Sequence, residues 1–400
     1  MSSEKKLIPL RRFPEFQDTV EWKEALVKDI CSIGTGKSNS QDQVENGQYP
    51  FFIRSEVPVR SNRFLYDCEA VITIGDGKIG KVFHYIKGKF DLHQRCYKMT
   101  DFKSVDGKFF YYFFSSHFYD RTIKMSAKAT VDSVRLEMIS EMPIYYPTFS
   151  EQRKIAECLS SIDTYISSVK EELEQLKAHK KSLLQKLFPQ SGKNLPEYRF
   201  PEYKTNRSWE IKALGSIVEQ ITDKAGDSNY LPVSISAGIG FIDQKKKFGR
   251  NISGKQYENY IVLKKGEFAY NKGNSLKYPQ GCVYQLKEYD VVTCPHVFIC
   301  FRIIDNKIDA NFLSYFFDNN YHGKQLQHFI TSSVRSNGLL NINADDFFSI
   351  LIPIPSLEEQ QHIVQIISSL DQIIVATNTK LKFLEAQKKG LLLQLFPFFN

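Results

Sequence analysis

Two glycine-containing strings are the first candidates for chemistry, because each comes close to a motif that binds nucleotide phosphates. Residues 31–38 (CSIGTGKS) lack the first glycine of a phosphate-binding loop, and the polar, Gly/Pro-broken segment that follows is not the helix such a loop requires. Residues 75–80 (GDGKIG) match the dinucleotide fingerprint, but residues 81–86 read as a strand, so a hairpin turn is the better interpretation. Neither string predicts a nucleotide site.

Metal and catalytic signatures are equally weak. Cys282, Cys294, His296 and Cys300 lack the short spacing of a zinc-chelating pair. The Asn/Asp-Pro-Pro-aromatic tetrapeptide of adenine methyltransferases does not occur, and the Glu-x-Lys strings at residues 21–23 and 210–212 match a nuclease motif by letters only. We therefore expect a chain that is not an enzyme and that holds no cofactor or metal of its own.

Basic and amide side chains are the stronger candidates, because they could contact a polyanion. Arg and Lys suit guanine edges, Asn and Gln suit adenine edges, and further cations hold phosphates. Loops 75–81 and 271–279 occupy equivalent places in the repeat described below yet differ in length and polar content, as loops that read different sequences would. Ordinary solvated surface is the alternative for every residue of this set. The candidate polyanion contacts are Arg54, Arg60, Arg63, Lys78, Lys81, His93, Arg95, Lys245, Lys246, Lys247, Arg250, Lys272, Asn274, Lys277, Tyr278, Arg335 and Asn337.

A segment that occurs twice must position these residues. Residues 147–189 align without a gap to residues 355–397, and each copy has the pattern of one long helix. Thr148 with Glu151, and Ser356 with Glu359, predict a capping box at each start, and a Phe-Pro pair ends each copy. Apolar residues between these signals alternate in steps of four and three, which indicates a coiled coil; at ~1.5 Å per residue each helix should be roughly 55 to 60 Å long.

Polar residues of these two helices are candidate contacts for a partner protein. Lys180 and Lys388 fall on the apolar seam at equivalent positions, where a charge costs stability unless it pairs or reaches solvent. They predict control of register, a partner contact, or a seam that splays near its end. The candidate partner contacts are Gln152, Asp163, Lys181, Gln360, Asp371 and Lys389, with a solvated face as the alternative.

The parts between the helices repeat more faintly. Phe13-Pro-Glu-Phe16 followed by Trp22 matches Phe200-Pro-Glu-Tyr203 followed by Trp209, and Asp106 with an aromatic run matches Asp309 with another. The expected fold class is α+β, with two related domains separated by two long helices that form a coiled coil. The expected boundaries are 1–147 and 190–355 for the domains, and 148–189 and 356–400 for the helices.

Composition limits the location and the partners. The net charge of +8 and a pI of about 8.9 favour a polyanion only modestly. No apolar run approaches the ~20 residues that span a bilayer, and the N-terminus has no signal-peptide core, so a cytoplasmic protein without a membrane partner is expected. Seven cysteines without a CxxC pair fit reduced thiols in that compartment.

Together these features resemble the specificity subunit of type I restriction-modification systems. The resemblance is carried by the Pro-x-x-x-Glu-Gln entries at 147–152 and 355–360, the central Asp163 and Asp371, the Leu-x-Phe-Pro exits and the Phe-Pro-Glu-aromatic openings. It implies two target-recognition domains and two helices packed as an antiparallel coiled coil, which gives the subunit pseudo-twofold symmetry. It also implies that each domain reads one half of a split, asymmetric target in double-stranded DNA, so the candidate polyanion contacts are candidate DNA contacts. It also implies that the helices set the spacing of the halves and dock two modification (methyltransferase) subunits, which bind S-adenosylmethionine, and that restriction subunits can join.

One alternative from another class remains open at the level of sequence. Two long helices could organise other proteins while the domains bind peptides or RNA, which would make the chain a non-enzymatic coiled-coil adaptor. Salt-dependent, sequence-specific retention of duplex DNA separates the two hypotheses, because an adaptor has no preferred duplex.

Overall fold

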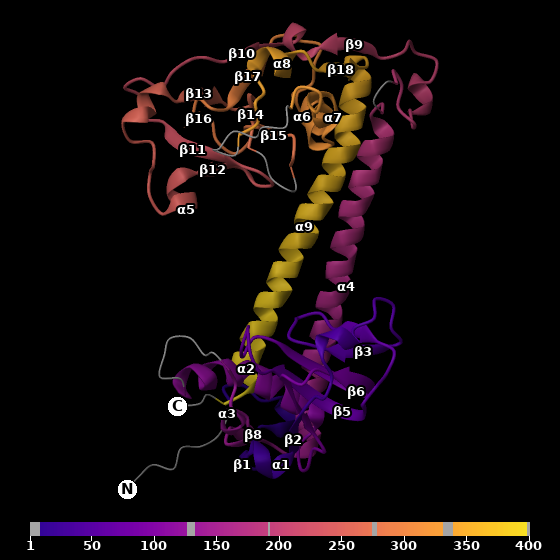
Figure 1. Cartoon of the computed structure of the whole chain (residues 1–400), viewed down its shortest axis with the longest axis vertical. Coiled ribbons are helices and arrows are strands. Elements are labelled where there is room, and N and C mark those ends of the chain that lie inside the picture. The colour runs from indigo at the N-terminus through magenta and orange to yellow at the C-terminus, as the bar shows by residue number, and fades with distance from the viewer. Residues whose placement is uncertain (1–8, 126–132, 191–192, 274–277, 331–338, 398–400) are drawn as a thin grey trace. The chain divides into compact units, whose positions relative to one another are not determined.

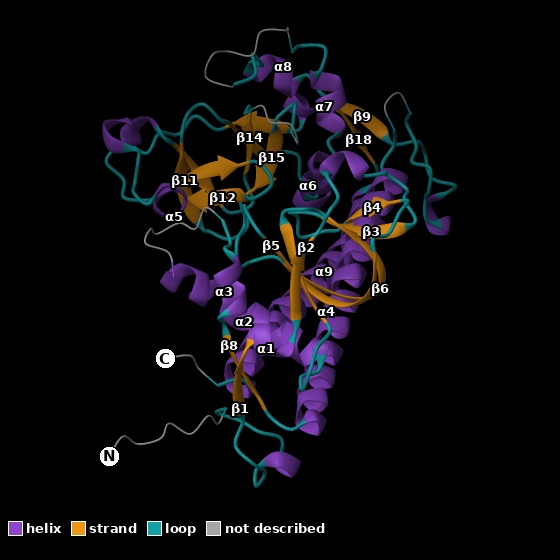
Figure 2. Ribbon diagram, turned by 60° about the horizontal axis from the view of Figure 1, so that its bottom comes forward, coloured by secondary structure: helices purple, strands orange, loops and turns teal. Residues whose placement is uncertain are grey.

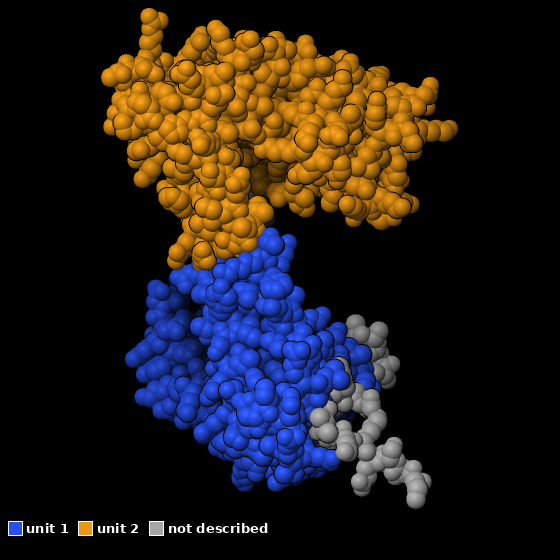
Figure 3. Space-filling view, turned by 180° about the vertical axis from the view of Figure 1, so that it is seen from behind, with its two compact units in different colours: residues 1–171, 378–400 blue, residues 172–377 orange. Residues whose placement is uncertain are grey.

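The chain folds into two compact units, which the computed structural model describes for residues 9–125, 133–190, 193–273, 278–330 and 339–397. Unit 1 comprises residues 1–171 and 378–400, and unit 2 comprises residues 172–377 (Figure 3). Each unit therefore holds one globular domain, the first part of the helix that follows it and the last part of the other long helix. None of the helices in these ranges is long and apolar enough to cross a membrane.

The domain of unit 1 is built on a six-stranded sheet with strand order β2-β7-β5-β6-β3-β4 (Figure 2). Only the β3–β6 pair is parallel; the other neighbours are antiparallel. The strands are β2 (Ser32–Thr35), β3 (Tyr49–Phe52), β4 (Val59–Ser61), β5 (Tyr66–Ile74), β6 (Phe83–Leu92) and β7 (Cys96–Thr100). The helices are α1 (Val27–Ile30), α2 (Gly107–Met125) and α3 (Leu136–Ser140), with short 3-10 turns η1 (Pro14–Phe16) and η2 (Ser40–Asp42).

Alternation along β5 gives this sheet a core on each face. Val71 points to the side where α2 packs its phenylalanines, whereas Ala70, Ile72 and Ile74 join a second cluster on the opposite face. Asp106 begins α2, because its Oδ1 accepts the backbone N–H groups of Lys108 and Phe109 at 3.0 and 2.9 Å. Residues 75–82 join β5 to β6 as a hairpin, as expected, and Gly77 and Gly80 have positive φ there.

The domain of unit 2 keeps the same strand order but splits the sheet. Its strands form two four-stranded sheets, β10-β17-β14-β15 and β12-β11-β16-β13, and only β11–β16 is parallel. The break falls at Gly266 (φ +91°), so β13 and β14 replace the single strand β5, while β15 and β16 replace β6. The strands are β10 (Val218–Gln220), β11 (Leu231–Ser236), β12 (Gly240–Asp243), β13 (Ile261–Lys264), β14 (Phe268–Asn271), β15 (Cys282–Gln285), β16 (Val291–Cys294) and β17 (Ile299–Ile303).

Short helices complete unit 2. Asp309 caps α6 as Asp106 caps α2, accepting the N–H groups of Asn311 and Phe312 at 2.8 and 3.0 Å. The helices are α5 (Gln244–Phe248), α6 (Ala310–Asp318), α7 (Tyr321–Leu326) and α8 (Ala344–Phe348), with 3-10 turns η3 (Pro201–Tyr203), η4 (Leu214–Ser216) and η5 (Gly254–Asn259). Two related α+β domains are thus confirmed.

A two-stranded antiparallel ladder closes each domain at its base. In unit 1, β1 (Lys23–Leu26) pairs with β8 (Pro143–Tyr146), and in unit 2, β9 (Glu210–Ala213) pairs with β18 (Leu351–Ile354). Since β8 and β18 directly precede the long helices, each ladder fixes the start of a helix to the first strand of its own domain.

The two long helices are α4 (Phe149–Leu187) and α9 (Leu357–Leu395), and within each unit their segments run antiparallel (Figure 1). A phenylalanine directly follows each helix and completes a core. Phe188 packs 5.0 Å from Phe312 and 6.4 Å from Trp209 in unit 2, measured between ring centroids. Phe396 packs 5.5 Å from Phe109 and 6.5 Å from Trp22 in unit 1. The repeated Phe-Pro exit is therefore a core element of the unit in which the helix ends.

The predicted capping boxes are wrong about the two glutamates. The hydroxyl of Ser356 accepts the N–H of Glu359 at 3.4 Å, as a capping box requires. The glutamate side chains, however, bind arginines of the preceding domain. Glu151 accepts two hydrogen bonds from Arg12, at 2.9 and 2.6 Å, and Glu359 accepts two from Arg199, both at 2.8 Å. A bidentate arginine is a stronger partner for a buried carboxylate than the single N–H of its own cap, so these pairs tie each domain to its helix.

Candidate functional site

In unit 1, three loops meet at one edge of the sheet through the carboxylate of Asp76, in the β5–β6 hairpin. Arg54, from the loop between β3 and β4, donates to Asp76 at 3.1 and 3.3 Å. Arg95, from the turn between β6 and β7, donates to it at 3.0 Å. Lys78 and Glu56 add an ion pair of 2.7 Å between the first two loops. These loops therefore form one surface that carries more positive than negative charge.

Asp76 stays ionised at the centre of this surface. Partial burial alone would raise its pKa, but the hydrogen bonds from Arg95 and Arg54 lower the pKa below its ordinary value. Both arginines remain accessible, with side chains 59% and 44% exposed. Asp76 thus orients two guanidinium groups whose remaining N–H donors face solvent, which is the arrangement that recognition of phosphate or a guanine edge needs.

Three of the residues predicted for this surface also form bonds within their own domain. His93 is buried, its Nδ1 accepts the N–H of Arg95 at 3.1 Å, and burial lowers its pKa; the prediction that it contacts DNA is wrong. Arg60 donates to the carbonyls of Gly47 and Gln48, both at 2.9 Å. Arg63 pairs with Asp42 at 2.7 Å and Asp91 at 3.3 Å.

Arg60 and Arg63 therefore hold β4 and the residues after it to the segment 42–48 and to Asp91 of β6. Lys78 and Lys81 are exposed, and Lys81 also lies 5.2 Å from the centroid of the Tyr119 ring.

The equivalent loops also meet in unit 2, with different residues. Gly238, between β11 and β12, donates its N–H to Tyr284 Oη of β15 at 2.6 Å. A Cβ built on Gly238 would lie 3.4 Å from Tyr278 Oη, which places the β14–β15 connection beside the same turn. Lys245, Lys246 and Lys247 are exposed on helix α5, as is Arg250 after it. Since α5 follows Asp243, which pairs with Val233, this basic group lies at the other end of β12 from the Gly238 turn.

Other predicted residues of unit 2 stand apart. Lys272 is partly buried and donates to the carbonyl of Ile342 at 3.3 Å, so its charge is directed to the domain itself. Asn274, Lys277, Arg335 and Asn337 lie outside the described residues.

The two glutamines predicted to face a partner protein are buried. Gln152 accepts the N–H of Asp106 at 2.7 Å and donates to the carbonyls of Ser104 and Pro147 at 3.1 and 2.9 Å. Gln360 repeats this pattern with Asp309, Lys307 and Pro355 at 2.8, 2.9 and 3.0 Å. Their exposures of 1% and 0% leave no surface for a partner, so the prediction is wrong for both. They lock the loop before α2 or α6 to the first turn of the long helix.

The lysines on the apolar seam find partners within their own units. In unit 1, Lys388 Nζ lies 2.5 Å from Asp163 Oδ1, while Oδ2 of the same aspartate accepts the hydroxyl of Tyr112 at 2.8 Å. In unit 2, Lys180 pairs with Asp371 at 2.6 Å, and Tyr315 donates to that aspartate at 3.0 Å.

We call each Lys–Asp–Tyr set a polar clasp. It joins one long helix to the other and to the domain, and this role accounts for the predicted partner contacts Asp163 and Asp371. Of the six residues predicted to contact a partner, Lys181 and Lys389 are the two that face solvent.

The buried arginine–glutamate pairs were missed from the sequence. Arg12 and Arg199 stand directly before the repeated Phe-Pro-Glu-aromatic string, so the repeat itself contained the signal. Only the structure shows that the partner is a glutamate 139 or 160 residues further along the chain.

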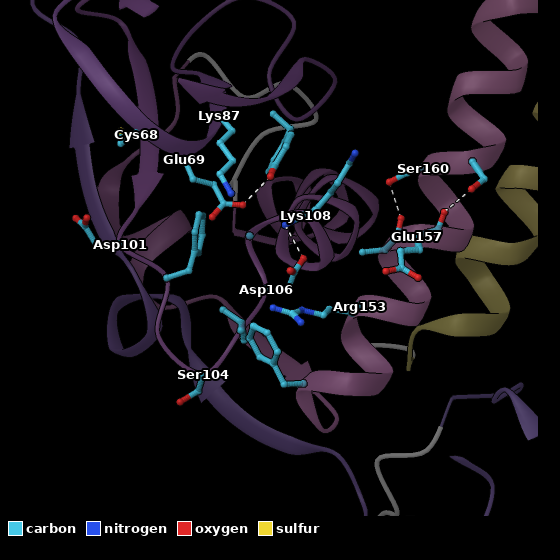
Figure 4. Close-up of a pocket in the computed structure, with 17 residues that line it drawn as sticks. Cys68, Glu69, Lys87, Asp101, Ser104, Asp106, Lys108, Arg153, Glu157 and Ser160 are labelled. Atoms are coloured by element: carbon cyan, nitrogen blue, oxygen red, sulfur yellow. Dashed lines mark hydrogen bonds between the residues drawn. The ribbon is translucent and has the colours of Figure 1, made fainter. Parts of the chain in front are cut away.

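A hollow of about 730 Å³ lies between the sheet of unit 1 and the first half of α4 (Figure 4). Glu69, Lys87 and Lys108 line it from the domain, and Arg153 and Glu157 line it from α4. Tyr85 donates to Glu69 at 2.6 Å, and a Cβ at Gly107 would lie only 2.6 Å from Glu69 Oε1, so the glutamate side chain packs directly on this glycine. Charges of both signs and open access suit a protein segment better than a nucleic-acid backbone.

Comparison with known proteins identifies this architecture. The family model described as type I restriction modification DNA specificity domain matches twice, at residues 19–178 and 206–386. The chain is 23% identical over 381 residues to the type I restriction enzyme EcoDI specificity subunit of Escherichia coli, covering 88% of this chain and 81% of that protein. It is 24% identical to the MjaVIII specificity subunit of Methanocaldococcus jannaschii, with 93% and 91% covered.

The fold agrees with a solved member of the same group. The crystal structure of the type I restriction-modification S subunit from M. genitalium superposes with a TM-score of 0.64 at 17% identity, covering 98% of this chain and 100% of that one. With two matched copies that take up most of its length, the chain belongs to the type I restriction-modification DNA specificity family.

Proposed function

We propose that this chain is the DNA-recognition subunit of a type I restriction-modification complex and is itself not an enzyme. Each domain reads one half of a bipartite, asymmetric target in double-stranded DNA. The observation that carries the proposal is the contrast between what the two domains share and what they vary. Strand order, helix cap, buried glutamine and polar clasp recur in both, whereas the loops at the edge of the sheet differ in length and charge.

The reading surface of each domain is the edge at which these loops meet. In the first domain we assign Arg54, Arg95, Lys78 and Lys81 to DNA. In the second domain we assign Tyr278 at this edge, and we add Lys245, Lys246, Lys247 and Arg250 at the other end of β12. Their side chains are accessible and their backbone elements are held by the contacts described above. Arginines held by a carboxylate suit base edges, while the lysines of α5 suit phosphates.

Two modification subunits are the proposed protein partners, one for each repeat, and restriction subunits can join them. S-adenosylmethionine belongs to the modification subunit, so this chain needs no cofactor. Lys181 and Lys389 are solvent-exposed at equivalent places on α4 and α9 and are the proposed contacts. In unit 1, the hollow that Arg153 and Glu157 of α4 line is a further proposed contact for the modification subunit.

The long helices set the separation of the half-sites in this proposal. Seven residues added to both helices between the two clasps keep the apolar seam in phase and lengthen each helix by about 10 Å. Because B-DNA rises about 3.4 Å per base pair, the preferred spacer should change while the half-sites stay the same. An unchanged spacer would refute this role of the helices.

Methylome sequencing of the host with and without this gene tests the function. Loss of one split adenine-methylation motif on deletion, and its return with the intact gene, is the expected result. Arg54→Ala together with Arg95→Ala should abolish methylation of that motif, whereas Lys154→Ala, at an exposed pair on α4 away from the loops, should not. A methylome that does not change on deletion would overturn the proposal. The family match leaves the adaptor hypothesis without support.

A further inference from the structure

Each domain exposes one branched aliphatic side chain at the tip of the same hairpin. Val57, in the loop between β3 and β4, is 74% exposed, and Ile239, between β11 and β12, is 70% exposed. Single exposed apolar residues are common on protein surfaces, so exposure alone indicates nothing. Their recurrence at one place in two domains that otherwise vary their loops is the observation that needs a cause.

The two hairpins are equivalent by their pairing. β3 runs parallel to β6 and antiparallel to β4, and β11 runs parallel to β16 and antiparallel to β12 (β11 and β12 are labelled in Figure 1). Both tips also adjoin a residue that we assign to DNA in their own domain. Glu56, next to Val57, pairs with Lys78, and a Cβ on Gly238, next to Ile239, would lie 3.4 Å from Tyr278 Oη.

Both tips are held in place. In unit 1 the hydroxyl of Ser55 donates to the carbonyl of Val57 at 2.5 Å, His84 Nε2 lies 3.1 Å from the carbonyl of Ser55, and Pro58 fixes the next φ. In unit 2 the N–H of Ile239 donates to the carbonyl of Ser236 at 3.0 Å. Gly238 and Gly240 on either side have φ of +81° and +93°, which other residues rarely adopt. An apolar side chain on a fixed tip loses little entropy on contact.

The chemistry of these side chains limits what they can bind. Valine and isoleucine have no hydrogen-bond donor or acceptor, so they cannot contribute to phosphate or polar base contacts. The major groove admits a two-stranded β-ribbon and offers one strongly apolar feature, the C5-methyl group of thymine.

We propose that Val57 and Ile239 are specificity residues that each contact a thymine methyl group in the half-site read by their own domain. This inference rests on the proposed function. It requires at least one thymine, on either strand, in each half-site, and a half-site without one would overturn it.

The test combines a change in the protein with a change in the DNA. The complete complex with its modification subunits is titrated with a duplex that carries the motif found by methylome sequencing, in which single thymines are replaced by deoxyuridine. For the unaltered complex, one replacement in each half-site should weaken binding by roughly threefold to fivefold, the effect of losing one buried methyl group. With Val57→Ala, the replacement in the first domain's half-site should have no further effect, and Ile239→Ala should behave likewise in the other half-site.

Matched substitutions away from the tips serve as controls. Val20→Ala in unit 1 and Ile304→Ala in unit 2 remove aliphatic side chains that are 74% and 57% exposed, and these variants should keep the full response to deoxyuridine. Deoxyuridine effects that persist unchanged in Val57→Ala and Ile239→Ala would overturn the thymine contact. The proposal would also be overturned if these variants bound more weakly while the unaltered complex did not respond to deoxyuridine, which is the result expected if the tips wedge between base pairs. Lack of any preference for the motif duplex by the unaltered complex would refute the proposed function as well.

Discussion

The substitution Lys388→Met tests how much a polar clasp contributes to the stability of its unit. In unit 1, Lys388 and Asp163 lie 2.5 Å apart, with side chains 25% and 33% exposed. An exposed ion pair is worth ~0.2–1 kcal/mol, and truncating one partner of a fully buried pair costs ~3–5 kcal/mol. Partial exposure places this pair between these limits and nearer the lower one. Methionine keeps most of the apolar stem on the seam, so a loss of ~1–2 kcal/mol in the free energy of unfolding of unit 1 is expected.

The two tryptophans of the chain make the measurement specific for each unit. Trp22 is buried in unit 1 and Trp209 is buried in unit 2. With Trp209→Phe as background, the fluorescence of Trp22 during urea unfolding should show a lower midpoint for Lys388→Met. With Trp22→Phe as background, the fluorescence of Trp209 should show an unchanged midpoint for the same variant. Lys180→Met should reverse this pattern, since its partner Asp371 lies in unit 2.

A double-mutant cycle decides whether the effect belongs to the ion pair. Lys388→Met and Asp163→Asn should lose less together than the sum of their separate losses, with a coupling of ~1 kcal/mol. The hydrogen bond from Tyr112 remains available to asparagine, so it does not enter this coupling. Losses that add within ~0.3 kcal/mol would refute the clasp as a stabilising contact, and Lys388 would then be a tolerated charge on a loose seam.

Three further predictions concern buried groups. Glu151→Gln leaves the charge of Arg12 buried without its carboxylate, so unit 1 should lose ~3–5 kcal/mol by Trp22 fluorescence, whereas Lys154→Met, at a half-exposed pair, should leave the midpoint nearly unchanged; equal midpoints for both would contradict the role of the buried pair. Burial lowers the pKa of His322 to about 4, so between about pH 6.5 and 4 this histidine is protonated in the unfolded chain but not in the folded one. Unit 2 should therefore lose up to about 3 kcal/mol of stability as the pH falls through this range. His322→Phe should remove the pH dependence of the Trp209 transition, and a pH profile that this variant leaves unchanged would refute the role of His322. A thiol reagent at pH 8 should label the half-buried Cys68 and Cys158 before Cys31 and Cys96, because burial raises the pKa of Cys31 and Cys96 to about 12. Peptide mapping that finds Cys31 and Cys96 labelled first would contradict their burial.

The sequence predicted the elements whose signals are local. The 3-4 spacing of apolar residues gave both long helices, and the hairpin reading of residues 75–80 is confirmed by the pairing of β5 with β6. The aromatic runs after Asp106 and Asp309 are the buried helices α2 and α6. These features depend on neighbours within a few turns or strands, which is the range over which periodicity and caps carry information.

The errors concern which polar residues are turned inward. Gln152, Ile155 and Leu159 follow one another at spacings of three and four, so the glutamine belongs to the buried stripe, and Gln360 repeats the pattern. The spacing of the two glutamines therefore indicates burial, whereas a polar side chain that recurs in both copies favours an exposed contact. Its hydrogen-bond partners are backbone groups of a distant loop, and no pattern in the sequence identifies them.

The candidate site could be predicted by loop but not by residue. Arg54 and Arg63 are alike in the sequence and are 44% and 50% exposed, yet Arg54 pairs with Asp76 at the loop edge and Arg63 pairs with the buried Asp91. The difference arises from pairing across separate strands, which the sequence does not reveal. The exposed tips Val57 and Ile239 were not predicted, because neither side chain has a hydrogen-bond donor that would mark it as a base contact.

The phenylalanine at the end of α9 also determines when each unit can be completed during protein synthesis. Unit 2 is one continuous stretch, residues 172–377, so the ribosome makes its whole core before it makes the end of α9. The core of unit 1 needs Leu395 and Phe396, which the ribosome adds after all of unit 2. Proteins usually fold from the N-terminus as they emerge, but here the first domain must wait with its Trp22 pocket open until Phe396 has been made. A ribosome that stalls within the second half of α9 would therefore hold a chain in which unit 2 can be complete and unit 1 cannot.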